Sequence, residues 1–359
     1  MRGGEKVLEA ICEIYPEATL FTLLRIPGAV SETIEKRPIR TSFVQRLPLP
    51  ARLYRHYLPL FPAAVEMFDL DGYDLVISSS HCAVKSVITR GDARHICYCH
   101  SPMRYAWDQF DAYFGPDQVG AWQSRLLRPI MAGLARWDRG TAQRVNQFVA
   151  NSTYVAGRIS RYYNRGSIVV YPPVDTDFYR PDPGSAQSGS GALVVSALVP
   201  YKRLDLAIDA CRLARIPLKI VGQGPEEARL RRMSDGSDVA FLGWRSDEEI
   251  RALYRAAGVV LLPGTEDFGI VPVEAQACGT PVVALADGGS LETVVDNVTG
   301  ALVPAAEAPM FAEAIRRVVE TPLDGREIRR HAERFSTANF KTAFAAAVSQ
   351  TPAPLAAAS

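Results

Sequence analysis

The sequence contains no apolar run that approaches the roughly 18 residues of a membrane-spanning helix, which argues against an integral membrane protein. Its first ten residues, MRGGEKVLEA, lack the apolar stretch of a secretory signal peptide. A surplus of either charge is absent as well, because 40 Lys and Arg stand against 39 Asp and Glu. Proteins that bind nucleic acid usually carry a basic surplus, so we expect no nucleic-acid partner.

Motifs for a bound metal or a dinucleotide are also missing. The six cysteines form no C-x2-C pair, and the acidic DLDGYD at 69–74 precedes a strand-like segment instead of following one. No G-x-G-x-x-G follows a first strand, as an NAD-dependent Rossmann enzyme would require. The cysteines lie mostly in apolar segments, as reduced thiols of cytoplasmic proteins do. The sequence therefore predicts no metal, no cofactor and a cytoplasmic location.

The segment ARHICYCHSPMRYAWD, residues 93–108, holds the densest group of potential metal ligands. Side chains alternate along a strand, so His95, Cys97 and Cys99 share one face and His100 lies on the other. We interpret the two cysteines as small core residues of a central strand. His100 then ends the strand at the carboxyl edge of its sheet, where α/β proteins bind ligands. A structural histidine with satisfied hydrogen bonds is the alternative.

Apolar strand-like runs alternate with amphipathic helical segments along the whole chain, most regularly in its second half. The strand-like runs there are ALVVSAL (192–198), PLKIVG (217–222), VAFLG (239–243), VVLLP (259–263) and PVVAL (281–285). This alternation predicts βαβ units and an α/β fold with parallel sheets. A chain of 359 residues is too long for one ordinary core and predicts two domains.

A Pro-, Gly- and Ser-rich segment, RPDPGSAQSGSG, divides the chain. We take residues 180–191 as a linker between an N-terminal domain, 1–179, and a C-terminal domain, 192–336. A final helix at 337–349 and a flexible tail at 350–359 are expected to follow. A doubly wound domain should begin with a strand, but the sequence begins with a Gly-Gly turn and a helix. The first strand of the N-terminal domain is therefore missing from the predicted pattern.

The segment GTEDFGIVPVEAQACGTPVVA, residues 264–284, carries the clearest binding chemistry. Glu266 follows a strand at its carboxyl end, and Glu274 lies about one turn into the next helix, on a face with little reason to carry a solvated acid. One carboxylate can accept hydrogen bonds from the hydroxyls of a sugar and the other from a ribose diol. The backbone amides at the start of the helix suit a phosphate; they belong to Phe268, Gly269, Ile270 and Val271.

Cations and glycines precede this segment in the C-terminal domain. Lys202 and Arg203, in SALVPYKRLD, lie between a strand and a helix, where they can neutralise a diphosphate. Gly222 and Gly224, in VGQGP, form a strand–turn–helix element whose backbone could pass beside a nucleotide. The alternatives are a solvated pair of cations and an ordinary tight turn.

These segments together resemble the signature of glycosyltransferase family four, retaining enzymes of the GT-B fold. The chain carries, in the order of that family, SALVPYKRLDLAI, IVGQGPE, FLGWRSDEEIRALYRAA, GTEDFGIVPVEAQACG and GGSLETVVDNVTGALV. NSTYVAGRI and VYPPVDTDFY resemble its interdomain region. YCHSPMRYAWD resembles the branch of bacterial mannosyltransferases of O-antigen and exopolysaccharide assembly, which use GDP-mannose.

The resemblance implies two Rossmann-like, doubly wound domains facing across a cleft, with the final helix crossing back to the first domain. It implies that the N-terminal domain binds the acceptor and the C-terminal domain binds the nucleotide sugar. The implied catalytic residues are His100, Lys202 and Glu266. The implied cleft residues on the acceptor side are Gly3, Gly4, Arg104, Tyr105 and Trp107. The family usually has an arginine five residues before Lys202, where this chain has Ala197.

The implied reaction is transfer of a hexose, mannose from GDP-mannose, to a lipid-linked oligosaccharide in surface polysaccharide biosynthesis. The anomeric configuration would be retained, and no metal would be required. A UDP-hexose donor is the alternative among enzymes. Because of Ala197 and the missing strand, a catalytically impaired nucleotide-sugar-binding protein is a further alternative.

Residues 118–174 contain eight arginines, no lysine and a single acid, Asp138. Large apolar residues interleave with these arginines, as an interfacial helix would require; they are Leu126, Leu127, Ile130, Met131, Leu134 and Trp137. We therefore predict peripheral contact with an anionic membrane, at the inner face of the plasma membrane. A solvated helix face is the alternative.

Overall fold

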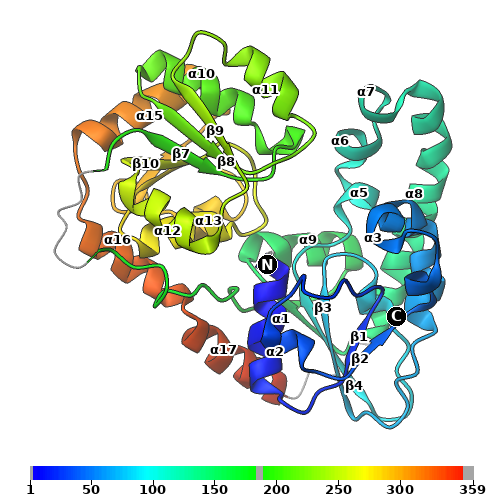
Figure 1. Cartoon of the computed structure of the whole chain (residues 1–359). Helices are drawn as coiled ribbons and strands as arrows, with labels where there is room; N and C mark the ends of the chain where they lie inside the picture. The colour runs from blue at the N-terminus through cyan, green and yellow to red at the C-terminus, as the bar shows by residue number, and fades with distance from the viewer. Residues whose placement is uncertain (1–2, 183–188, 351–359) are drawn as a thin grey trace. The chain divides into compact units, whose positions relative to one another are not determined.

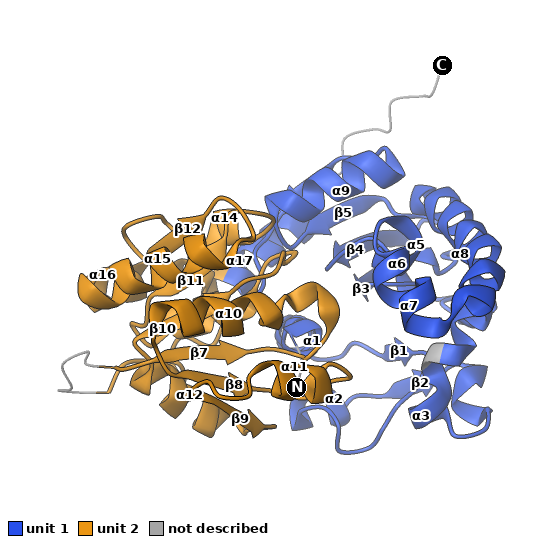
Figure 2. Cartoon of the chain, turned by 90° about the horizontal axis from the view of Figure 1, so that it is seen from above, with its two compact units in different colours: residues 1–173, 340–359 blue, residues 174–339 orange. Residues whose placement is uncertain are grey.

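The structure is a computed structural model that describes residues 3–182 and 189–350 (Figure 1). The chain forms two compact units (Figure 2). Unit 1 consists of Met1–Pro173 and Phe340–Ser359, and unit 2 consists of Val174–Asn339. The chain therefore passes from unit 1 to unit 2 at residues 173 and 174, and not within the expected linker at 180–191.

The position of this boundary follows from contacts that the residues after it make in unit 2. Tyr179 is buried, and its ring lies 5.9 Å from the ring of Tyr254. Arg329 donates a hydrogen bond of 3.2 Å to the carbonyl of Tyr179. The Pro- and Gly-rich composition thus marks a segment that precedes the first strand of unit 2, not the connection between units. Residues 183–188 of the expected linker lie outside the described residues.

Unit 2 contains a six-stranded parallel sheet with the strand order β12-β11-β10-β7-β8-β9. Its strands are β7 (Ala192–Val195), β8 (Leu218–Val221), β9 (Val239–Gly243), β10 (Val259–Leu262), β11 (Val282–Leu285) and β12 (Gly300–Val303). Most residues of the central strands are buried and aliphatic, because helices cover both faces of a parallel sheet. The predicted alternation of strands and helices is confirmed for this half of the chain.

Helices lie on both faces of this sheet, with α10, α11 and α15 on one side and α12 and α13 on the other (Figure 1). Aliphatic and aromatic side chains of α10 and α15 pack together over the sheet, among them Ile208, Phe311 and Ile315. The helical segments are η5 (Pro200–Lys202), α10 (Leu204–Ala214), α11 (Glu227–Met233), α12 (Asp247–Ala256), α13 (Ile270–Ala277), α14 (Ser290–Thr293), α15 (Ala308–Glu320), α16 (Gly325–Ala332) and η6 (Glu333–Phe335).

Unit 1 contains a four-stranded parallel sheet and a separate parallel pair of strands. The sheet has the order β3-β4-β5-β6, from β3 (Leu75–Ser80), β4 (Arg94–Cys99), β5 (Gln147–Ala150) and β6 (Ser167–Val169). The pair consists of β1 (Leu20–Thr22) and β2 (Ile39–Thr41). Among the described residues no strand precedes the first helix, α1 (Gly3–Ile14), as the sequence predicts. β1 and β2 accordingly form a pair apart from β3–β6.

The helices of unit 1 vary in length from single turns to α8, which runs for 21 residues through Pro129. They are α1, α2 (Glu32–Glu35), η1 (Phe43–Arg46), α3 (Pro50–Leu53), η2 (Tyr54–Leu60), α4 (Phe61–Glu66), η3 (Val84–Ser86), α5 (Arg104–Trp107), α6 (Phe110–Phe114), α7 (Pro116–Val119), α8 (Ala121–Thr141), η4 (Ala142–Arg144) and α9 (Thr153–Tyr163). Over the described residues, no helix has the length and apolarity needed to cross a membrane.

The last helix, α17 (Thr337–Ser349), packs into the core of unit 1 from residue 340 onward. The rings of Phe340 and Phe344 lie 5.7 and 5.9 Å from the ring of Tyr98 on β4. The Gln147 side-chain amide donates a hydrogen bond of 2.8 Å to the carbonyl of Ala347. A helix at 337–349 that returns to the first domain is what the family resemblance implies. Residues 351–359 of the expected tail lie outside the described residues.

Candidate functional site

Lys202 and Glu266 form an ion pair at the carboxyl edge of the unit 2 sheet. Lys202 ends η5 in the loop after β7, and Glu266 lies in the loop after β10. Because β7 and β10 are hydrogen-bonded neighbours, the loops that follow them leave the sheet side by side. The side chains are only 16% and 14% exposed, so water screens the two charges weakly.

Two glycines that sequence reasoning missed hold the Glu266 loop in place. A Cβ at Gly264 would lie 2.5 Å from the carbonyl oxygen of Tyr201, so only glycine lets this loop touch the Lys202 loop. Gly288 has φ +68°, and a Cβ there would lie 2.4 Å from the carbonyl oxygen of Glu266. The Glu266 loop is thus clamped between two others. The Gly-Gly pair in GGSLET was the available sequence signal.

The start of α13 lies directly beyond Glu266. Gly269 is the residue before the helix and has φ +88°, a conformation that favours glycine. Phe268 is buried against Phe335, with ring centroids 5.5 Å apart, so only its backbone can serve a ligand. The amides of Gly269 and of the half-buried Ile270 and Val271 belong to the same turn. The structure therefore gathers the four residues predicted to bind phosphate at one helix N-terminus.

Glu274 points into unit 2 and is 6% exposed, so it is not a solvated surface residue. Its Oε2 accepts a hydrogen bond of 3.0 Å from the hydroxyl of Tyr254. Burial raises the pKa of the Tyr254 hydroxyl well above its ordinary value, and the Glu274 carboxylate raises it further. The hydroxyl therefore stays protonated and donates. This bond ties α13 to α12, and binding of a ribose diol by Glu274 stays a prediction.

Arg203, expected to supply a second cation for a diphosphate, is engaged locally. Its backbone has φ +54°, and its Nε lies 3.2 Å from both carboxylate oxygens of Asp205. The Asp205 carboxylate offsets part of the positive charge of this guanidinium, and binding of a diphosphate by Arg203 stays a prediction. Lys202 is the cation at the ion pair itself.

Close backbone packing inside unit 2 explains why glycine occupies positions 222 and 224. A Cβ at Gly222 would lie 1.9 Å from the carbonyl oxygen of Ser196, and one at Gly224 would lie 2.2 Å from that of Leu198. The turn after β8 therefore runs against the backbone that follows β7, and any larger residue would force the two apart. Close approach of this turn to a nucleotide stays a prediction.

In unit 1, His100 and Gly4 lie together. The Nε2 atom of His100 is 2.8 Å from the hydroxyl of Ser79, and a Cβ at Gly4 would lie 3.6 Å from the same nitrogen. Gly3 is the first residue of α1. Burial, with a smaller contribution from the nearby His81, lowers the pKa of His100 to about 3. The imidazole is therefore neutral at pH 7 and can donate or accept hydrogen bonds there without carrying charge.

Two of the three α5 side chains implied on the acceptor side have partners within unit 1, and their contact with an acceptor stays a prediction. The Tyr105 hydroxyl lies 2.5 Å from the thiol of Cys82. Trp107 donates from Nε1 to Asp138 Oδ2 at 2.7 Å, and its ring stacks on Tyr162 at 4.7 Å. One face of the indole and both polar atoms thus have internal partners. Arg104, in the first turn of α5, is half-buried.

Asp138 of α8 holds the surrounding helices together. The sequence indicated only that it is the single acid of a basic region. It is completely buried and pairs with buried Lys85, whose Nζ lies 3.0 Å from Oδ1. Oδ2 also accepts a hydrogen bond of 2.8 Å from the hydroxyl of Tyr163. A buried carboxylate needs such partners, so α5 and α9 are held against α8 through one side chain.

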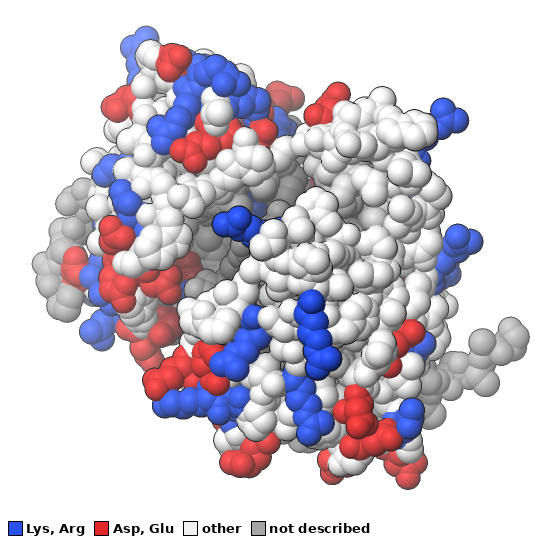
Figure 3. Space-filling view, turned by 45° about the vertical axis from the view of Figure 1, so that its right-hand side comes forward, with Lys and Arg blue, Asp and Glu red and all other residues white. Residues whose placement is uncertain are grey.

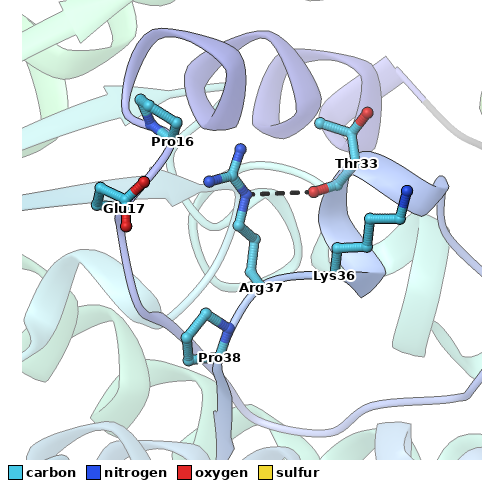
Figure 4. Close-up of a pocket in the computed structure, with 6 residues that line it drawn as sticks. All are labelled: Pro16, Glu17, Thr33, Lys36, Arg37 and Pro38. Carbon is cyan, nitrogen blue, oxygen red and sulfur yellow. Dashed lines mark hydrogen bonds between the residues drawn. The ribbon is translucent and has the colours of Figure 1, made fainter.

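Other features of the described residues do not add a binding site. No group of three or more His, Cys, Asp or Glu in this part of the chain could hold a metal. The six cysteines are free, and Cys97 and Cys99 are buried core residues of β4, as interpreted. A hollow of about 340 Å³ near the N-terminus (Figure 4) is lined by Pro16, Glu17, Thr33, Lys36, Arg37 and Pro38.

The hollow in Figure 4 contains none of the predicted site residues, and its arginine is engaged with backbone. Arg37 donates from Nε to the carbonyl of Thr33 at 3.3 Å and from Nη2 to the carbonyl of Cys12 at 2.8 Å. These bonds join the turn after α2 to the end of α1. We read the hollow as a consequence of that packing.

Comparison with known families identifies the chain. A model of "Glycosyltransferase Family 4" matches residues 17–178, and a model of "Glycosyl transferases group 1" matches residues 175–340. The chain belongs to glycosyltransferase family four. Curated relatives include the D-inositol 3-phosphate glycosyltransferases of Mycobacterium tuberculosis and Mycobacterium bovis, 36% identical over 198 residues. The match covers 48% of this chain and 41% of each relative, so it spans less than half the length of those proteins.

Solved structures of similar fold include other glycosyltransferases. HepE of Anabaena, in complex with UDP and glucose, has a TM-score of 0.68 and 21% identity, covering 97% of this chain and 96% of HepE. Sucrose-phosphate synthase of Thermosynechococcus elongatus has a TM-score of 0.69 and 19% identity, covering 94% and 90%. The lipopolysaccharide outer core galactosyltransferase WaaB has a TM-score of 0.64 and 17% identity, covering 97% and 96%. At these identities the similarity shows the fold, which is GT-B with two Rossmann-like domains.

Proposed function

We propose that the chain is a retaining glycosyltransferase that moves a hexose from a nucleotide sugar to an acceptor hydroxyl. The observation that carries the proposal is the Lys202–Glu266 ion pair beside the N-terminus of α13. A cation, a carboxylate and the first backbone amides of a helix lie at the carboxyl edge of a parallel sheet, where they can bind the phosphates and the sugar hydroxyls of such a donor. Membership of family four supports the reaction class.

The chemistry follows from the charge that develops as the glycosidic bond to the diphosphate breaks. Negative charge then builds on the leaving phosphate, where the Lys202 ammonium and the amides of Gly269 and Ile270 stabilise it. Glu266, released from Lys202, accepts hydrogen bonds from hydroxyls of the sugar. In the same-face route proposed for retaining enzymes, the departing phosphate oxygen accepts the proton of the acceptor hydroxyl. The new bond forms on the face that the phosphate leaves, which retains configuration.

The Lys202–Glu266 ion pair has a role in this scheme. Two charges this weakly exposed would each cost free energy if unpaired, so they neutralise one another until the donor arrives. Donor binding replaces one pair with two interactions, phosphate with Lys202 and sugar hydroxyls with Glu266. His100 near the donor sugar is implied by the resemblance alone and stays a prediction.

For the donor and acceptor, we propose mannose from GDP-mannose and a lipid-linked oligosaccharide in surface polysaccharide biosynthesis. The support is the resemblance of YCHSPMRYAWD to the mannosyltransferase branch. A UDP-hexose is the second candidate, and similar solved structures of HepE contain UDP with glucose and UDP-glucose. Because Ala197 stands where the family usually has an arginine, a nucleotide-sugar-binding protein with little turnover is a third candidate.

A donor screen tests these candidates in one experiment. The melting temperature of the purified protein is measured in the presence of GDP, UDP, GDP-mannose and UDP-glucose. Transfer of sugar to a panel of lipid-linked oligosaccharides is then measured by mass spectrometry. GDP should raise the melting temperature more than UDP does. The reverse order would move the assignment to the UDP-hexose, and donor binding without any product would favour the impaired protein.

Two variants test the site itself. Glu266→Gln and Lys202→Met each remove one charge of the pair with little change of shape, and both should abolish transfer with every donor. Arg212→Gln, at an exposed ion pair on α10, is the matched control and should leave transfer unchanged. Wild-type turnover in either site variant would remove that residue from the mechanism. EDTA should not slow the wild-type protein.

A further inference from the structure

The outer side of α8 exposes a stripe of large apolar side chains. Trp122, Leu126 and Ile130 are 76%, 57% and 37% exposed. Residues four apart lie on one face of a helix, so the three side chains form a row, with the exposed Pro129 beside it. Single exposed apolar residues are common on proteins, but a row of this kind on one helix marks an interaction surface.

The exposed charges on the same helix are all positive. Arg125, Arg128, Arg136 and Arg139 are exposed, and the single acid of α8, Asp138, is buried with Lys85. Only Arg128 among these four has a described carboxylate partner, Asp111, at 2.8 Å. The part of unit 1 around α7 and α8, at the upper right of Figure 3, is mostly uncharged, with Lys and Arg at its right-hand margin and Asp or Glu at its top.

Some arginines of the region 118–174, for which we predict contact with an anionic membrane, have partners within unit 1. Arg144 pairs with Glu66 at 2.7 Å, and Arg158 is 6% exposed and pairs with Asp108. Arg165 donates to the carbonyls of Ala142 and Val145. These three arginines hold unit 1 together. Of the other five, four are exposed on α8 and one, Arg161, is exposed on α9.

The inward-facing side of α8 is fixed to the rest of unit 1. Met131 and Leu134 are buried, and Trp137 donates from Nε1 to Glu66 at 3.0 Å. The stripe is therefore presented by a helix that already has a packed inner face. It need not refold or turn to meet a partner, which keeps the ordering cost of docking low.

We propose that this outer face of α8, made of Trp122, Leu126 and Ile130 with Arg125, Arg136 and Arg139, docks on an anionic lipid bilayer. Tryptophan and leucine beside arginine are the composition of a helix that lies in the bilayer interface, where guanidinium groups meet lipid phosphates. A protein partner would need acidic groups set to match four arginines, whereas a bilayer supplies diffuse negative charge. The inference deepens the proposed function, since a lipid-linked acceptor lies at that surface, but its test needs no activity.

The test is co-sedimentation of the full chain with vesicles of phosphatidylcholine, with and without phosphatidylglycerol. The chain should bind only the anionic vesicles, and added salt should release it. Each of Arg125→Gln and Arg136→Gln should weaken binding about fivefold. Trp122→Ala with Leu126→Asp should weaken it more than tenfold. Trp244→Ala, at a 70% exposed tryptophan of unit 2, is the matched control and should bind as the wild type does.

Several outcomes would overturn the proposal. Equal binding by the α8 variants, or an equal loss in Trp244→Ala, would place the contact elsewhere. A dimer that forms without lipid and disappears in Trp122→Ala would assign the face to a second copy of the chain. Melting curves show whether each variant is folded, and Leu126→Gln replaces Leu126→Asp if the latter is not. Vesicle binding with no sugar transfer would refute the proposed function and leave the docking face intact.

Discussion

Replacing Lys85 with methionine should destabilise unit 1 by about 3–5 kcal/mol, because it leaves the Asp138 carboxylate buried without its cation. Lys85 and Asp138 are 1% and 0% exposed, so water cannot take over the lost partner. The Lys85 ammonium also donates 2.6 Å to the carbonyl of Asp138 and 3.3 Å to the hydroxyl of Thr141. Methionine fills most of the volume, so the loss reports charge and hydrogen bonding instead of a cavity.

A double-variant cycle separates the ion pair from ordinary packing. Asp138→Asn alone strands the Lys85 ammonium and should cost a similar amount. Lys85→Met combined with Asp138→Asn removes both charges and keeps an acceptor for Trp107, so it should cost less than the two single losses added together. The coupling should exceed about 1 kcal/mol, since the two side chains are in direct contact.

Urea unfolding followed by tryptophan fluorescence measures these losses. Unit 1 contains Trp107, Trp122 and Trp137, and unit 2 contains Trp244. In a Trp244→Phe background the fluorescence therefore reports unit 1 alone. If both single variants lower the free energy of unfolding by less than about 1 kcal/mol, the reasoning is refuted, because an unpaired buried charge should destabilise the fold by more than that. Strictly additive losses in the double variant would show that the two groups act separately.

Two further predictions concern the loops and the histidine. Gly264→Ala should weaken donor binding in a nucleotide melting assay and leave the unfolding of unit 1 unchanged, because its Cβ would push the Glu266 loop off the carbonyl of Tyr201; undiminished binding would contradict the clamp. The half-buried His100 has a pKa of about 3, below its ordinary value, so the unfolded chain takes up a proton that the folded one does not. The unfolding free energy of unit 1 should therefore fall as pH drops below about 6.5, by up to about 1.4 kcal/mol per pH unit for this group. His100→Gln should have a shallower dependence in urea titrations between about pH 7 and 4.5, and an unchanged slope would contradict burial as the cause.

The pairing of Lys202 with Glu266 has a consequence for how the protein should respond to its donor. Lys202 and Glu266 already neutralise one another. An isolated phosphate would give a new partner to Lys202 alone, whereas a complete nucleotide sugar would give new partners to both side chains. The site geometry therefore favours the intact donor over free diphosphate-containing fragments. A donor that lacks sugar hydroxyls should bind more weakly than one that has them.

Local patterns in the sequence predicted the framework of the site. Strand-like runs separated by helices put Lys202 and Glu266 in loops after strands, and parallel strands collect such loops at one edge. The alternation of side chains along β4 placed Cys97 and Cys99 in the core and His100 at the strand end. These predictions succeed because period and position along a strand are set by neighbouring residues.

Only the tertiary structure decided which side chains are available. Trp107 and Tyr105 were expected to meet a sugar, but Asp138 and Cys82 bind their polar atoms inside unit 1. Asp138 and Lys85 lie 53 residues apart in the chain, and no local pattern connects them. The same holds for the arginines of 118–174, of which some pair internally and some remain on the surface of α8. The sequence determines where a residue lies in its own strand, helix or loop, whereas its partners come from distant segments that meet only when the chain folds.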